Sequence, residues 1–296
     1  MNIFTMNIVS MAREASSHKN SGKKKAIVKF IIRTLLHYSY IKKMNDNFAH
    51  DERKMLFKKQ PNFLTKCITP YLRNGLSRQE IIDILVKHYD WFEYKFSTDA
   101  RHQIYDDVLT LYKLEIDEQD YLINLSFDRN SRKEGELTLT LTDSKYNKYY
   151  VLAFTVVDND IYIGCMQGGA NDNGFSKLFT KSIYGLRPKS FMVETLRLLA
   201  VNLNINHIYA VKNSAHIYTA KRYGKKSKMI GLDYDRLWKE HNGESHNDYF
   251  YVLPIKSERK AMEDIKRPKR KMYRERYAWL DNYDKELKNT LDYICN

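Results

Sequence analysis

Cysteine, glycine and proline are scarce in this chain of 296 residues, and each shortage excludes a class of protein. The three cysteines are widely spaced and form no C-x-x-C pair, which argues against a disulfide scaffold or structural zinc and suits a reducing compartment. Neither His241 nor His246 has cysteines or carboxylates at a metal-ligand spacing, so we expect no metal site. Eleven glycines and five prolines are too few for a β-sandwich with many tight turns or for long flexible linkers.

A long apolar run is also lacking. The first 25 residues contain no basic segment followed by an apolar stretch, so the sequence predicts no cleavable signal peptide. The best apolar run, from Ala26 to Leu36, is interrupted by Lys29 and Arg33 and is too short to span a bilayer. We therefore expect a cytoplasmic protein with no integral membrane span, and a peripheral position at the inner membrane is the alternative.

Positive charge is what the sequence has in excess, with a formal net charge of +14 at pH 7. A basic surface attracts nucleic acid, anionic lipid or phosphorylated small molecules, although a merely solvated surface has the same charge. Hydrophobic residues make up 43% of the chain, which is enough for a globular core.

The hydrophobic pattern divides the chain into four parts and predicts an α+β protein. Residues 1–24 are polar and mixed, so we expect disorder there. Residues 25–118 are predicted to be helical, 119–255 to form a domain with a mixed sheet, and 256–296 to form a basic helical tail packed on the core.

Within the helical region, apolar residues recur at helical spacing from Lys25 onward. We interpret this segment as an amphipathic helix packed on the rest of the protein, and a helix on a membrane surface is the alternative. Ser77 and Glu80 form an S-x-x-E capping box that predicts a helix start. A further helix is predicted from Thr98 to Leu114.

Apolar and polar residues then begin to alternate, as in a strand. The alternating segments of residues 121–167 predict an antiparallel meander of three or four strands. Pro188 is predicted to open a helix, and HIYAV at 207–211 to form a buried strand. A second helix is expected at 233–241 and a last strand at 249–253.

Several sequence blocks, in their order, resemble the VirK/YbjX family of enterobacteria, and most closely its plasmid-borne virulence members. The blocks are IYIGCMQGG, YGLRPKSFMVETLRLLAV, DYDRLWKEHNG with YFYVLP, and KRPKRKMYRERY. The resemblance implies a virulence-associated accessory protein that acts after transcription on the surface display of an outer-membrane autotransporter or another envelope component. It also implies a part in resistance to antimicrobial peptides, but no reaction, cofactor or catalytic residue.

The order of strands and helices over residues 136–254 is similar to the core of the GNAT acyltransferase fold. This likeness implies an alternative function, in which acyl-CoA or an acyl carrier supplies an acyl group to a lipid or protein. The loop from Gly168 to Leu186 is longer than the GNAT phosphate loop and lacks its R/Q-x-x-G-x-G/A motif. A splayed gap between the strands at 161–167 and 207–211 would favour the enzyme, and a closed sheet would favour a non-catalytic binding protein.

Two glycine-bearing segments are predicted to bind an anion such as the phosphates of acyl-CoA. The first, QGGANDNG, follows a strand, and the backbone N–H groups of Gln167, Gly168 and Gly169 can approach an anion closely. A strand-ending turn explains the same residues equally simply.

The second segment, GLRPK, precedes a predicted helix. The free N–H groups of the helix start and the charges of Arg187 and Lys189 favour a phosphate beside Gly185. An ordinary helix start with solvated basic residues is the alternative.

Candidate catalytic residues are aromatic. Tyr218, His216 and Tyr234 lie after the predicted buried strand, where a tyrosine or histidine could transfer a proton during acyl transfer. Packed aromatics in a polar loop, and a helix start capped by Asp233, are the simpler interpretations.

The densest basic stretch lies in the tail. Arg267, Arg270, Arg274 and Arg276 alternate with aromatic residues, a combination that can bind RNA or anionic lipid. The aromatic residues also have helical spacing, which favours a helix that packs its aromatic edge on the core.

Overall fold

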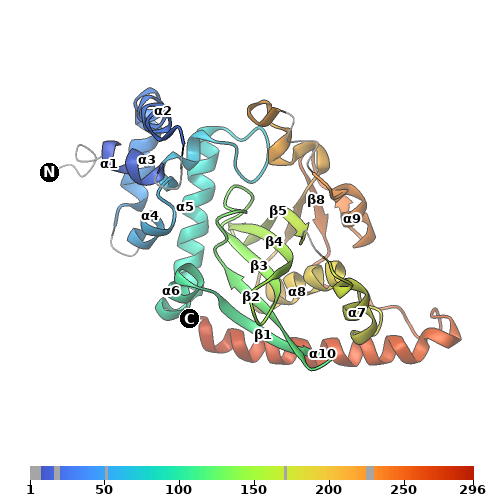
Figure 1. Ribbon diagram of the computed structural model, residues 1–296. Helices are drawn as coiled ribbons and strands as arrows, with labels where there is room; N and C mark the ends of the chain where they lie inside the picture. The colour runs from blue at the N-terminus through green and yellow to red at the C-terminus, as the bar shows by residue number, and fades with distance from the viewer. Residues whose placement is uncertain (1–7, 17–20, 51–52, 170–171, 225–229) are drawn as a thin grey trace.

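The computed structural model describes residues 8–16, 21–50, 53–169, 172–224 and 230–296 (Figure 1). The helical region comes first along the chain. It contains α1 (Ile8–Ala15), α2 (Lys23–Leu36), α3 (Tyr38–Phe48), α4 (Lys54–Lys59), the 3-10 helix η3 (Phe63–Ile68), α5 (Arg78–Lys95) and α6 (Thr98–Asp106).

An eight-stranded sheet, counted over the described residues, has the order β1-β2-β3-β4-β5-β6-β8-β7. β1 to β5 form an antiparallel meander, β5 and β6 pair in parallel, and β6, β8 and β7 are antiparallel. The strands are β1 (Leu109–Ile116), β2 (Gln119–Ser126), β3 (Leu137–Asp143), β4 (Lys148–Val157), β5 (Asp160–Gly168), β6 (Ile208–Val211), β7 (Glu244–Ser245) and β8 (Phe250–Leu253).

Helices pack on both faces of this sheet. Helices α5 and α6 pack against one face, while α8 (Pro188–Asn202) and α10 (Arg270–Ile294) pack against the other, so every residue of β3 up to Thr142 is buried (Figure 1). Further helical segments are α7 (Phe175–Ser182), α8 (Pro188–Asn202), α9 (Tyr234–Glu240), α10 (Arg270–Ile294) and the 3-10 turns η4 (Asn213–Ala215), η5 (Ile217–Thr219) and η7 (Arg267–Lys269).

The predicted α+β class is confirmed, and so are several local predictions. The Ser77 hydroxyl accepts from the Glu80 N–H while the Glu80 carboxylate accepts from the Ser77 N–H, as a capping box requires. Pro188 takes the first position of α8. Among the described residues, no helix combines the length and the apolar character that a membrane crossing requires.

The structure differs from the prediction at the edge of the sheet. The helix expected from Thr98 to Leu114 ends at Asp106, and the strand β1 begins at Leu109. Side chains along β1 alternate largely between buried and exposed positions, and β2 supplies the hydrogen-bonding partner. The predicted helical region up to residue 118 thus contains the first strand of the sheet.

The two ends of the chain were predicted as a disordered segment and a helical tail. Within residues 1–24, the structure has α1 and the start of α2, while residues 1–7 and 17–20 lie outside the described residues. The tail is helical in α10, which follows the turn η7 around Pro268.

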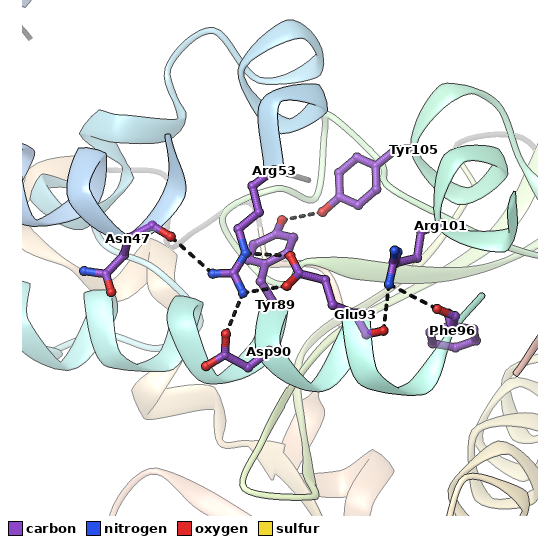
Figure 2. Close-up of polar contacts among 8 residues, drawn as sticks. All are labelled: Asn47, Arg53, Tyr89, Asp90, Glu93, Phe96, Arg101 and Tyr105. Atoms are coloured by element: carbon purple, nitrogen blue, oxygen red, sulfur yellow. Dashed lines mark hydrogen bonds and ion pairs between the residues drawn. The ribbon is translucent and has the colours of Figure 1, made fainter. Parts of the chain in front are cut away.

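A buried ion pair joins the helical region to the sheet. The Lys66 ammonium of η3 contacts the carboxylate of Glu136, the residue before β3, and both side chains are buried. Tyr89 of α5 donates to the other Glu136 oxygen over 2.6 Å, and its hydroxyl also contacts that of Tyr105 on α6 (Figure 2). Burial alone would raise the pKa of Glu136, but Lys66 and the neighbouring donors outweigh burial and lower it, so the carboxylate stays ionised.

Arg53 makes a second buried link, within the helical region. Its guanidinium pairs with Glu93 through two nitrogens and with Asp90, both on α5, and donates to the Asn47 carbonyl of α3 (Figure 2). The Arg53 side chain is only 5% exposed, so these partners replace most of its water. The contacts hold α3 against α5.

The variant E136Q should lower the free energy of unfolding by roughly 3–5 kcal/mol, because the Lys66 ammonium then stays buried without its counter-charge. Urea denaturation followed by circular dichroism measures this loss. The exposed pair Lys113–Asp120 provides the control, and D120N should cost about 0–1 kcal/mol. Equal losses in the two variants would contradict a special contribution of the buried pair.

Candidate active site

Strands β5 and β6 pair over only three residues, and a pocket lies beside the end of β5 that extends beyond this pairing. The parallel register joins Ile161–Ile163 to Ile208–Ala210, while β5 continues to Gly168. Gly164 is the additional residue of a bulge between β5 and β4, and such a bulge bends a strand. β6 ends at Val211, so the second half of β5 extends beyond its pairing with β6.

A tyrosine occupies part of the gap between the two strands. The Tyr234 hydroxyl, at the start of α9, accepts from the Met166 N–H over 3.2 Å and donates to the Met166 carbonyl over 3.1 Å. Burial raises the pKa of Tyr234 well above its usual value, so the hydroxyl keeps the proton that it donates. Tyr234 thus pairs with the β5 edge at one residue, in place of a strand.

The pocket has a volume of about 920 Å³. It lies between the end of β5, helix α7, the start of α8, the turns after β6 and the segment that leads into α9. Helix α7 lies within the segment from Gly168 to Leu186, which the sequence predicts to be a long loop. The residues that line the pocket are Tyr150, Met166, Gln167, Gly168, Ser176, Lys177, Thr180, Arg187, Pro188, Lys189, His216, Tyr218, Ile230, Gly231, Leu232 and Tyr234.

The charge of the pocket is positive. Lys177 of α7 and Arg187 and Lys189 at the start of α8 belong to its lining, which contains no aspartate or glutamate among the described residues. Pro188 is the first helical residue and the side chain of the N-cap residue Arg187 does not cap α8, so that side chain uses none of the first-turn N–H groups. An anion in the pocket would meet three full charges and the positive end of the α8 dipole.

The structure brings four of the six predicted anion-binding residues together. Gln167, Gly168, Arg187 and Lys189 line the pocket, whereas the two other glycines do not. The Gly169 N–H donates to the Tyr149 carbonyl over 2.6 Å, and the Gly185 N–H donates to the Thr180 carbonyl over 2.7 Å. These two N–H groups are already used, and Ala170 and Asn171 of the same loop lie outside the described residues.

Gly185 lets the tail helix α10 pack against the turn before α8. It adopts a φ of +80°, and a Cβ there would lie 2.8 Å from the Arg276 guanidinium. Arg276 of α10 donates twice to the neighbouring Tyr184 carbonyl, over 2.9 and 2.7 Å. The tail therefore holds the turn that leads to Arg187 and the pocket.

The four arginines predicted to bind a polyanion separate into two pairs. Arg276 is used as described, and Arg270 donates to the Ile265 carbonyl over 2.9 Å. Arg267 and Arg274 are exposed. Polyanion binding by the tail stays a prediction. Of the four arginines predicted for it, two are exposed.

The three candidate catalytic residues line the same pocket. His216 Nδ1 accepts from the Tyr218 N–H over 3.3 Å, and the Tyr234 hydroxyl is bound to Met166. Tyr218 is half-buried, and burial, with a contribution from Glu134, raises the pKa of Tyr218 to about 12. Its hydroxyl therefore stays protonated at neutral pH and can donate.

Glu134 is a buried residue of the site that the sequence did not reveal. Its Oε1 lies 3.2 Å from His216 Nε2, out of line for a hydrogen bond, and accepts from Gln167 Nε2 over 3.5 Å. The Glu134 side chain is only 1% exposed. The Glu134 backbone can lie against β5 because Gly164 has no side chain. A Cβ at that position would lie 1.8 Å from the Glu134 carbonyl oxygen.

A family model described as a protein of unknown function (DUF535) matches residues 19–289. The chain belongs to this family. Similar proteins include the uncharacterized protein YbjX of Escherichia coli (strain K12), which is 28% identical over 273 residues, or 89% of this chain and 82% of the relative. The VirK/YbjX family predicted from the sequence blocks is confirmed.

Two uncharacterized proteins of Haemophilus influenzae are also similar to this DUF535 chain. One is 31% identical over 166 residues, which is 55% of each chain, and the other is 32% identical over 176 residues, which is 58% of each. No solved structure matches. The DUF535 match includes both the pocket and the Lys66–Glu136 pair.

In this DUF535 chain, G164A should lower the free energy of unfolding by about 3 kcal/mol, because its methyl group would collide with the Glu134 backbone. G231A is the control, since Gly231 also lines the pocket but has open space around it. The control should stay within about 0.5 kcal/mol of the wild type. Urea denaturation measures both, and equal stability of the two variants would contradict the close packing at Gly164.

Proposed function

We propose that this protein is an acyltransferase that takes an acyl group from coenzyme A or an acyl carrier and passes it to a lipid or a protein. One observation supports this most: the end of β5, which extends beyond its pairing with β6, and the cationic start of α8 line the same pocket. The pocket also has an apolar part, formed by Met166, Ile230 and Leu232, beside which an acyl chain can lie.

The chemistry of the donor matches two parts of the pocket. Its phosphates would bind at Arg187, Lys189 and the first turn of α8. Its pantetheine arm carries amides, which can pair with a free strand edge. The Tyr234 hydroxyl already binds the Met166 N–H and carbonyl, so the arm would pair farther along this edge of β5, where strand alternation puts the N–H and carbonyl of Gly168.

In the transfer step, a nucleophilic nitrogen or oxygen of the acceptor attacks the thioester carbonyl carbon. A C–N or C–O bond forms and the C–S bond breaks, while the nucleophile loses a proton to solvent and the departing thiolate gains one. We assign Tyr218 as the donor of that proton, because its side chain lines the pocket and its hydroxyl is protonated at neutral pH. His216, whose Nδ1 holds the Tyr218 N–H, would be a positioning residue.

The double variant R187Q/K189Q should bind acyl-CoA about tenfold or more weakly, because both changes remove a cation from the phosphate site. Isothermal titration calorimetry with acyl-CoA of several chain lengths measures the affinity. K271Q/R274Q, which removes two exposed cations from α10, is the control and should bind like the wild type. Absence of heat and of any thermal shift in the wild type, for every chain length, would overturn the proposal.

The variant Y218F should bind acyl-CoA with unchanged affinity but lose most turnover, about a hundredfold or more, because the leaving thiolate loses its proton donor. Cells fed an alkyne-tagged fatty acid provide the readout when the acceptor is unidentified. Tagged products that depend on the wild-type protein should disappear with Y218F. Identical products in both strains would contradict a catalytic Tyr218.

The resemblance to VirK/YbjX proteins supports a biological setting for this reaction. We propose that the acceptor is an envelope component, and that acylation assists surface display of an outer-membrane client and resistance to antimicrobial peptides. Cells with Y218F should then lose both properties, as a deletion strain would. Full complementation by Y218F would separate the envelope role from acyl transfer.

A further inference from the structure

The outward face of α2 is apolar, although a helix on a protein surface normally presents polar residues there. Val28, Ile32, Leu35 and Leu36 are 55%, 50%, 58% and 73% exposed. Their spacing, i, i+4, i+7 and i+8, places them on one side of the helix. The other side faces the protein, where Thr34 is fully buried. We call these four residues the α2 stripe.

Positive charge accompanies the α2 stripe. Lys24, Lys25 and Lys29 are exposed on the same helix. The sequence contains no aspartate or glutamate between Glu14 and Asp46. An exposed helix that has apolar residues, several lysines and no carboxylates of its own is complementary to an anionic bilayer, whose headgroups attract the lysines and whose acyl region accepts the stripe.

We propose that α2 docks this protein on the surface of a membrane that contains anionic lipid, with the helix axis along the surface. The helix has 14 residues, which is too short to cross a bilayer and suits an interfacial position. A second copy of the chain fits this face less well, because two such faces would bring their lysines together. The proposal is independent of acyl transfer.

The docked helix is tied to the rest of the molecule. Only His37 separates the end of α2 from the start of α3 at Tyr38, and Arg53 fixes α3 to α5 through Asp90 and Glu93. Because α5 packs on the sheet, a membrane-bound α2 positions the whole described body at the bilayer (Figure 1).

Flotation of the full chain with lipid vesicles tests the proposal. The wild type should bind vesicles of phosphatidylcholine with phosphatidylglycerol, bind phosphatidylcholine alone far less, and dissociate as salt is raised. I32S/L36S should bind the anionic vesicles about tenfold more weakly, since it removes two apolar contacts. K25Q/K29Q should weaken binding to anionic vesicles and reduce its salt dependence.

The matched control is Y94S/Y293S, which removes two exposed aromatic side chains on α5 and α10. It should float like the wild type, and all variants should keep the wild-type melting curve because their changes are on the surface. Three results would overturn the proposal: no vesicle binding by the wild type, unchanged binding by I32S/L36S, or an equal loss in the control. A wild-type dimer that I32S/L36S converts to monomer would assign the stripe to self-association instead.

Discussion

The ion pair of Lys66 and Glu136 is the contact on which the arrangement of the molecule depends. A charged group buried without a partner is strongly unfavourable, so the two residues can stay inside only while η3 and β3 keep their relative position. Tyr89 and Tyr105 extend this constraint to α5 and α6. A displacement of the helical layer along the sheet would break the pair, and the layer is therefore fixed in one register.

The same short segment connects the helical layer to the pocket. Glu134 lies two residues before Glu136 and borders His216 and Gln167. Between the two glutamates, Gly135 is pressed on β4, where a Cβ would lie 2.4 Å from the Phe154 nitrogen. Glu136 thus fixes residues 134–136 to the helical layer, and Glu134 lies next to His216 and Gln167 of the pocket.

Features that depend on neighbours in the sequence were predictable. The capping box at Ser77, the helix start at Pro188 and the alternating strands of the meander depend on local geometry. Gln167 and Arg187 were identified because a glycine-rich loop follows a strand and a basic segment precedes a helix. The structure places both in one pocket, although their function stays a proposal.

Features that depend on distant contacts could not be predicted. β1 fits helical spacing as well as strand alternation, and only pairing with β2 decides between them. The burial of Glu134 requires the close approach of Gly164, and Arg276 reaches a carbonyl 92 positions away. The periodicity of α2 indicates an amphipathic helix, but a sequence does not show how much of its apolar surface the protein covers.

The hydroxyl of Tyr234 limits the length of any molecule that binds along the edge of β5 beyond its pairing with β6. Because it already satisfies both backbone groups of Met166, an extended molecule can add to the β5 edge only on the outer side of that residue. The inner end of such a molecule stops at a phenol ring, while its outer end lies towards α8. In the proposed acyltransferase, the length of chain between these two points would select among ligands that share the same charged and reactive groups.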